Sequence, residues 1–143
     1  MHRHFIGFAA IFLIWAEAAI AWETPARGTA TRAALMDAVR PTAEYLLGAP
    51  VEFVVYELRQ SGNLAFGMLH AQRPGGVQID HATTPAVRRG DMEAWEDVTD
   101  AQGVYRLTGN GWVVEDYAFG ATDVWFAAEP FCTQYRAVIS DYC

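Results

Sequence analysis

Residues 51–69 constrain the fold more than any other stretch, because they are typical of two β-strands joined by a tight turn. The segment VEFVVYELRQSGNLAFGML alternates apolar side chains with a period of two on both sides of Gln60-Ser61-Gly62-Asn63. Such spacing, rich in β-branched and aromatic residues and bounded by Gly, Asn and Ser, predicts a β-hairpin. Any fold for this chain must therefore accommodate that hairpin.

A second hairpin is predicted over residues 104–119. Its two apolar runs, VYRL and WVVEDYAF, flank Thr108-Gly109-Asn110-Gly111, where Asn110 and Gly111 are expected to supply positive φ angles. Residues 70–103 between the hairpins have only a weak pattern, with a short strand expected at Val77 and Ile79. A connection of that length indicates either a functional loop or an ornament.

The segment before the first hairpin predicts a helix. Thr29 or Thr31 can cap it, and Ala34, Leu35, Ala38 and Val39 follow at helical spacing. Pro41 removes a backbone donor, so we expect a kink or two short helices that meet at Arg40-Pro41. Near the C-terminus, Tyr135 to Ile139 is expected to form a short strand or turn.

The first 21 residues have the three parts of a cleavable secretory signal. MHRH is a basic start, Phe5 to Trp15 is an unbroken apolar run, and Ala19-Ile20-Ala21 ends in small residues. A membrane anchor is the alternative, but a spanning helix needs roughly 20 apolar residues and Glu17 interrupts this run. We therefore predict export to the periplasm or beyond, and a single mature domain over residues 22–143.

Export makes the two cysteines informative, because disulfides persist in oxidising compartments. Cys132 and Cys143 are the only pair. A redox or metal-binding dithiol is the alternative, yet the chain has no CxxC motif and no ligand cluster beside them. We predict a structural disulfide that ties the last residue back to the domain.

One helix followed by two hairpins predicts an α+β fold, with a kinked N-terminal helix packed on a curved antiparallel sheet of four to five strands. The Arg40-Pro41 helix, the VEFVV…LAFGML hairpin and the late GNGWVVEDYAFGATDVW stretch resemble small exported proteobacterial proteins. Their layout is similar to the cystatin-like or nuclear-transport-factor-2-like α+β roll. This resemblance covers about residues 25–125 and implies a fold, but no activity.

The net charge of the chain limits the classes of partner that it is expected to bind. The formal net charge is −7, and all basic side chains are arginines scattered singly rather than in a stripe. Plain electrostatics therefore disfavour nucleic acid and anionic membranes as partners. The acidic residues between 91 and 100 are interpreted as a solvated face.

Catalytic motifs are weak throughout. Asp80 and His81, together with His70, form the only acid–imidazole grouping of the mature chain, and Asp123 is a further candidate general base. A metal site needs three or four convergent ligands, which this spacing does not enforce, so no metal is predicted. No Gly-rich phosphate loop or nucleophile elbow is present, so no cofactor is predicted either.

Aromatic residues are the better lead to function. Trp95, Trp112, Trp125, Tyr56, Tyr105 and Tyr117 are candidates to line the concave side of a curved sheet, with Arg106 or Asp123 as the orienting polar group. Core packing is the alternative for any of them. The predicted binding residues are Trp125, Asp123, Arg106, Tyr56 and Trp95.

Three functional hypotheses follow. The leading one is a non-enzymatic exported module that binds a small molecule, a peptide or another envelope protein. The second is an enzyme on the same roll, with Asp80, His81 or Asp123 as general base. The third is an interaction protein that forms a homodimer through its sheet face.

Overall fold

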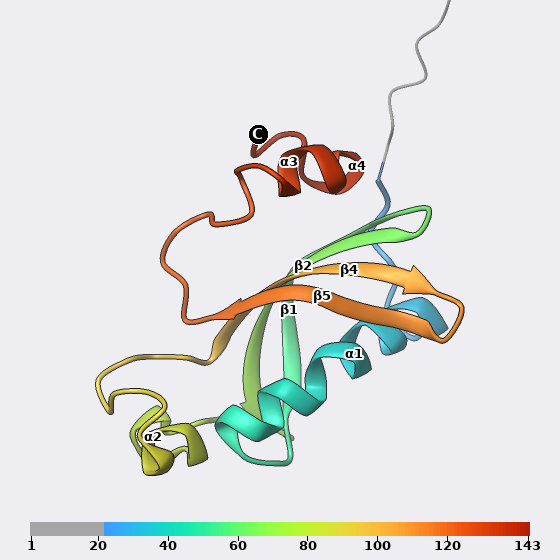
Figure 1. Ribbon diagram of the computed structural model, residues 1–143. Coiled ribbons are helices and arrows are strands. Elements are labelled where there is room, and N and C mark those ends of the chain that lie inside the picture. Colours follow the sequence, from blue (N-terminus) through green and yellow to red (C-terminus); the bar gives the residue numbers. More distant parts are fainter. Residues whose placement is uncertain (1–21) are drawn as a thin grey trace, which may run out of the picture.

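The computed structural model describes residues 22–143, which form one antiparallel sheet between two helical layers (Figure 1). The predicted leader, residues 1–21, lies outside the described residues. The elements in chain order are α1 (Ala30–Leu47), β1 (Glu52–Ser61), β2 (Leu64–Arg73), β3 (Val77–Gln78), η1 (His81–Thr83), α2 (Pro85–Arg89), β4 (Asp100–Thr108), β5 (Gly111–Phe119), α3 (Phe131–Gln134) and α4 (Arg136–Ile139).

The strand order confirms the predicted α+β class with a curved, open antiparallel sheet. Four of the five strands lie in the order β1-β2-β4-β5, and the fifth, the short β3, pairs with the end of β2. Both hairpins form where predicted, since Ser61 pairs with Leu64 and Thr108 pairs with Gly111. The predicted positive φ at Asn110 is wrong. Gly111 alone takes it, at 105°, and among the described residues only glycines have positive φ.

Helix α1 is a single helix, so the alternative of two short helices is wrong. Thr29 caps it by accepting a hydrogen bond from the backbone N–H of Arg32 at 3.3 Å. The helix continues through Pro41, whose side chain is exposed. The carbonyl of Asp37, which loses its helical donor at Pro41, also belongs to an exposed residue, so water can satisfy it.

One face of the sheet packs against α1. Leu35, Met36 and Val39 of the helix contact Leu58, Leu69 and Tyr105 of the strands, and Trp112 and Phe119 pack at the side of this cluster. Further along the helix, Leu47 packs with Val51 and Ala71. Helical and strand periodicities meet here to form a dry apolar core.

The opposite face is also covered, which the prediction of one apolar face did not anticipate. Phe66 and Val104 of the sheet pack with Phe126, Tyr135, Val138 and Ile139. We call residues 125–143 the C-terminal layer. Tyr135 to Ile139 is therefore not a strand: α3 and α4 are two one-turn helices, which Figure 1 shows on the side of the sheet away from α1.

The predicted disulfide is confirmed. Cys132 in α3 is bonded to Cys143, which is 11 residues later in the chain. Both cysteines belong to the C-terminal layer, so the bond closes this layer on itself and does not link it to the sheet. The layer must therefore be held on the sheet by other contacts.

Candidate functional site

The structure separates the six candidate aromatic residues instead of gathering them around one concavity. Tyr105 is fully buried in the core beneath α1, and burial raises the pKa of its phenol. Trp112 packs at the side of the same core, so α1 occupies the space that a pocket would need. Trp125 lies on the other face, whereas Tyr56 and Trp95 are exposed, at 64% and 78%.

The predicted pair Trp125 and Asp123 divides between core and solvent. The indole of Trp125 meets the rings of Phe126 and Phe131 edge-on, with centroids 5.6 and 5.1 Å away. Its Nε1 is buried and has no hydrogen-bond partner among the described residues. Asp123 is exposed. The indole therefore packs the C-terminal layer, and no contact in the described structure joins it to the carboxylate.

Arg106 holds elements together. Its Nε lies 2.9 Å from both carboxylate oxygens of Glu115, and its guanidinium lies 5.3 Å from the ring centroid of Tyr135. The hydroxyl of Tyr135 donates to the same carboxylate. The Tyr135 bond, with the Arg106 contact, lowers the pKa of Glu115. Arg106 thereby connects β4 and β5 to the C-terminal layer.

His70 has a different partner from the one its sequence neighbourhood indicates. Its Nδ1 lies 2.7 Å from Oδ1 of Asp100 in β4, and its Nε2 lies 2.8 Å from Oε1 of Gln78. The amide nitrogen of Gln78 faces oxygen atoms of Gln72 and Gly76, so its oxygen must face the histidine. Burial lowers the pKa of His70, but the bonds with Gln78 and Asp100 outweigh it, so the pKa is raised.

This arrangement does not favour a general base, because both ring nitrogens of His70 already face acceptors. Asp80 caps η1 by accepting from the backbone N–H of Ala82 at 3.1 Å, and His81 begins that turn. Among residues 22–143, no three His, Cys, Asp or Glu side chains are placed to hold a metal ion. The predicted acid–imidazole grouping therefore divides in two: His70 links β2 to β4 and β3, and Asp80 caps η1.

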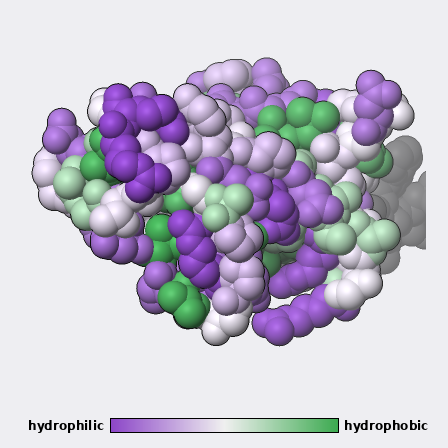
Figure 2. All heavy atoms as spheres, turned by 90° about the horizontal axis from the view of Figure 1, so that it is seen from below, coloured by the Kyte–Doolittle hydropathy of each residue, from purple (hydrophilic) through white to green (hydrophobic). Residues whose placement is uncertain are grey.

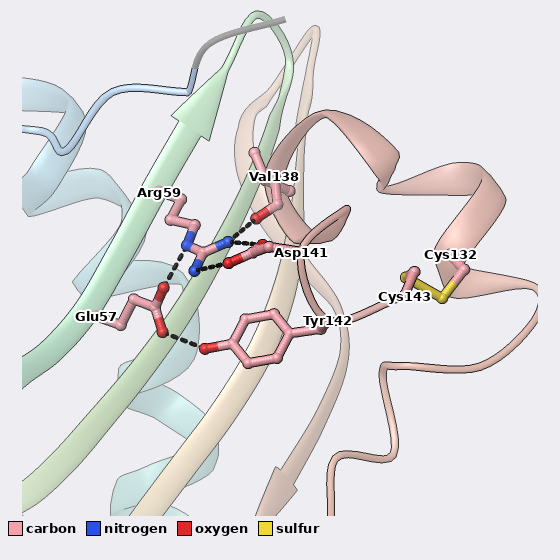
Figure 3. A network of polar contacts seen from close by, with 7 residues as sticks. All are labelled: Glu57, Arg59, Cys132, Val138, Asp141, Tyr142 and Cys143. Atoms are coloured by element: carbon pink, nitrogen blue, oxygen red, sulfur yellow. Dashed lines mark hydrogen bonds and ion pairs between the residues drawn. A yellow bond between two sulfur atoms is a disulfide. The ribbon is translucent and has the colours of Figure 1, made fainter.

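Arg59 is the centre of a polar network that no sequence motif predicts (Figure 3). Only 5% of the residue is exposed. Its guanidinium donates to the carbonyl of Val138 at 2.9 Å and to both carboxylate oxygens of Asp141, while its Nε contacts Glu57. Tyr142 donates to the same Glu57 at 2.6 Å. The network joins β1 to the C-terminal layer.

The aromatic groups around Arg59 complete this connection. Its guanidinium carbon lies 4.4 Å from the ring centroid of Trp22 and 5.0 Å from that of Tyr142. The backbone of Glu23 pairs with that of Gln60 by two hydrogen bonds of 2.9 and 2.8 Å. Because every polar group of the guanidinium has a protein partner, we interpret the network as structural.

A hollow beside Trp95 is the best-formed concave site in the described part of the chain. Its volume is about 450 Å³, and it lies where the loop before β4 meets the end of β5. The lining combines apolar, aromatic and acidic side chains with one glycine: Met92, Trp95, Glu96, Asp97, Val98, Phe119, Gly120 and Thr122. Of the predicted binding residues, only Trp95 belongs to it.

Gly120 lets the two walls of the hollow approach each other. A Cβ atom at this position would lie 2.7 Å from the carbonyl oxygen of Asp97, and the residue has a φ of 71°. Its N–H donates to the carbonyl of Asp100 at 2.7 Å. A side chain here would push the walls apart, so the glycine is required by both space and backbone conformation.

The hollow is electronegative. Thr99 donates to Asp97 from its N–H and its hydroxyl, at 3.0 and 2.6 Å. These bonds, with the charges of His81 and His70, lower the pKa of Asp97 and keep it ionised. One oxygen of Glu96 accepts from the N–H of Glu93 at 2.9 Å. No Arg, Lys or His side chain of the described chain lines the hollow.

The remaining surface gives little sign of another apolar site on the side viewed in Figure 2. Hydrophobic residues there form separate small spots among hydrophilic ones, and a broad apolar patch is the usual mark of a protein interface. Within residues 22–143, no helix combines the length and apolarity that crossing a membrane requires.

Comparison with known proteins adds no relative: no family model, no curated protein and no solved structure matches this chain. The resemblance to the cystatin-like and nuclear-transport-factor-2-like rolls therefore stays a prediction. Function has to be argued from the hollow itself.

Proposed function

We propose that this chain is an exported, non-enzymatic binding protein that holds a small cationic ligand in the hollow beside Trp95. Residues 1–21 act as its cleaved leader, and the mature domain adopts a roll of the cystatin-like or nuclear-transport-factor-2-like type. The Cys132–Cys143 disulfide is compatible with an oxidising compartment. The predicted homodimer is not needed for this function, because the hollow is built within one chain.

The observation that carries the proposal is the combination of an exposed indole with two acidic residues in a hollow that no Arg or His side chain lines. Trp95 is 78% exposed at the rim of a hollow that Met92 and Phe119 also line. An exposed indole costs free energy in water, and its negative π face attracts a cation. Asp97 and Glu96 add negative charge at the same place, and no cationic side chain of the described hollow neutralises it.

The enzyme alternative has less support in the geometry. Asp80 caps η1, His81 is the first residue of that turn, and Asp123 is exposed and outside the hollow. A general base needs a free lone pair within reach of a bound substrate. These three side chains do not share a concave site.

The test compares choline with its neutral carbon isostere, dimethylbutanol, which has the same shape without the charge. Tryptophan fluorescence of the oxidised protein, expressed with its own leader, should change on titration with choline and not with the isostere. Trp95→Ala should weaken binding by about tenfold or more. Trp22→Ala, a second exposed tryptophan outside the hollow, should leave it unchanged.

Three outcomes would contradict the proposal, the first two for its binding site and the third for its leader. Equal binding of choline and dimethylbutanol would show that charge is not recognised. An undiminished response in Trp95→Ala would place the site elsewhere. A mass spectrum of the exported protein that still contains residues 1–21 would contradict the leader.

A further inference from the structure

The outer edge of β1 is open beside a second hollow. β1 is the first strand of the sheet, and among the described residues its outer side pairs only at Gln60, with Glu23. Residues 52–55, four consecutive positions of this strand, line a hollow of about 420 Å³. A run of edge backbone that lines a concavity is a template for another extended segment.

The charge of this hollow is opposite to that of the chain. Arg27 and Arg32 line it together with a single carboxylate, that of Glu52, although the chain as a whole carries a net charge of −7. Glu52 also accepts from the N–H of Gly75 at 3.1 Å. Arg27 is exposed and makes no hydrogen bond or ion pair with any residue between 22 and 143.

The length of the open edge is limited at both ends. The register of β1 against β2 shifts between Val55 and Glu57, so Tyr56 is a bulge that interrupts regular pairing. At the other end of the run, the backbone of Val51 is already paired. Its carbonyl accepts a hydrogen bond from Arg40, and its N–H donates to Glu44. Residues 52–55 therefore offer room for about four residues of a partner strand, or ~13 Å of extended chain.

We propose that this edge binds a short acidic peptide segment of a partner protein, which adds a strand to β1 and places its carboxylates at Arg27 and Arg32. The backbone of residues 52–55 supplies the hydrogen bonds, and Val54, which is 37% exposed, contacts an alternate side chain of the peptide. A second copy of this chain is a poor occupant, because β1–β1 pairing would bring the arginines of both copies together. This site is separate from the Trp95 hollow, so either proposal can fail alone.

The test uses three labelled peptides and fluorescence anisotropy on the oxidised protein expressed with its own leader. The first is Thr-Val-Thr-Val-Asp-Asp, the second ends in Lys-Lys, and the third is the acidic peptide with alternate backbone nitrogens methylated. The acidic peptide is expected to bind. The lysine peptide and the methylated peptide should each bind at least about tenfold more weakly, because one lacks charge complementarity and the other lacks donors.

Arg27→Glu is the informative variant, with Arg136→Glu as its matched control. Both residues are exposed, and Arg136 lies in α4 of the C-terminal layer, so both variants change the net charge equally. Only Arg27→Glu should weaken binding of the acidic peptide, by about tenfold. Equal effects of the two variants, undiminished binding of the methylated peptide, or no binding of the acidic peptide at millimolar concentration would each overturn the proposal. So would a dimer in sedimentation that the peptide displaces, since this would assign the edge to a second copy.

Discussion

The two faces of the sheet are covered in different ways. On one face, an 18-residue helix lays an apolar stripe across the strands, and the contact is made by Leu35, Met36 and Val39. On the other face, the cover consists of two four-residue helices and a turn. That second cover is attached to the sheet by a buried arginine and a group of aromatic rings, and a disulfide closes the cover on itself.

The difference shows what a short segment needs in order to form a layer. A long helix buries enough apolar area to hold its own position, whereas a single helical turn is unstable in isolation. The C-terminal layer compensates with specific bonds: Arg59 fixes Asp141 and the carbonyl of Val138, and the Cys132–Cys143 bond restricts the chain between. The α1 face should therefore govern the stability of the whole domain, and the bonds of the second face should govern that of the C-terminal layer.

The largest effect is expected from Leu35→Ala. Leu35 is fully buried at the centre of the α1 face, and truncation leaves a cavity in a well-packed core. The free energy of unfolding should fall by about 3 kcal/mol, as measured by urea denaturation. Tyr45→Ala on the outer side of the same helix, where the side chain is 62% exposed, should cost less than about 1 kcal/mol. Similar losses for the two variants would contradict a core centred on α1.

Removal of the disulfide should have the second largest effect, and it should act on the C-terminal layer. The double variant Cys132→Ser, Cys143→Ser removes a cross-link between residues 11 positions apart. It should lower the free energy of unfolding by about 2–3 kcal/mol. Limited trypsin digestion separates the layers, because Arg136 lies in the C-terminal layer and Arg32 lies in α1. Cleavage after Arg136 should accelerate well before cleavage after Arg32. If both bonds are cut at the same rate, the two layers unfold together and the comparison fails.

Replacement of the buried arginine should have the next largest effect. Arg59→Met keeps the aliphatic stem but removes the arginine's hydrogen bonds to the carbonyl of Val138 and to the carboxylates of Asp141 and Glu57. We expect a loss of about 2 kcal/mol in thermal or urea denaturation. Arg106→Met is the control, because the side chains of Arg106 and Glu115 are 32% and 39% exposed and such pairs contribute less than about 1 kcal/mol. An equal loss in both variants would show that burial of the arginine is not what matters.

The same contrast explains what could be predicted from the sequence. Both hairpins and α1 have periodic apolar spacing over many residues, and this signal predicts elements correctly. The helices α3 and α4 are one turn each, too short for any periodicity, so the sequence predicts only a strand or turn over residues 135–139 and no element over α3. The run LAFGML does contain a missed signal: it is apolar at successive positions, as expected for a strand covered on both faces.

The candidate site was less predictable because its residues meet through the register of distant strands. His70 was grouped with Asp80 and His81 by nearness in sequence, but the β2–β4 pairing places Asp100 opposite it. Trp95 is predicted as a binding residue on the concave side of the sheet, but it lies in the loop before β4. Phe119 and Gly120 line the same hollow only because β5 ends beside that loop. Nothing in the sequence around Arg59 predicts that this side chain is buried, because its burial arises only from tertiary packing.

The smallest effect is a pH dependence with opposite signs in two regions of the sheet's second face. The bond to Arg59 lowers the pKa of Asp141, so its contribution is present above the unfolded pKa of about 3.9 and is lost as pH falls through the folded value. The raised pKa of His70, faced by Asp100, Gln78 and Tyr56, works in reverse. Its contribution is complete below about 6.5 and is lost as pH rises through the folded value.

Stability measured by urea denaturation should therefore be highest between about pH 4 and pH 6.5, with each limb below about 1 kcal/mol because Asp141 and Asp100 are largely exposed. Asp141→Asn should reduce the acid limb, to which the lowered pKa values of Asp97 and Glu115 also contribute, and should leave the alkaline limb unchanged. His70→Asn should reduce the alkaline limb alone. If one variant reduced both limbs, the C-terminal layer and the His70–Asp100 contact would be coupled. The contacts on the second face would then unfold as one unit.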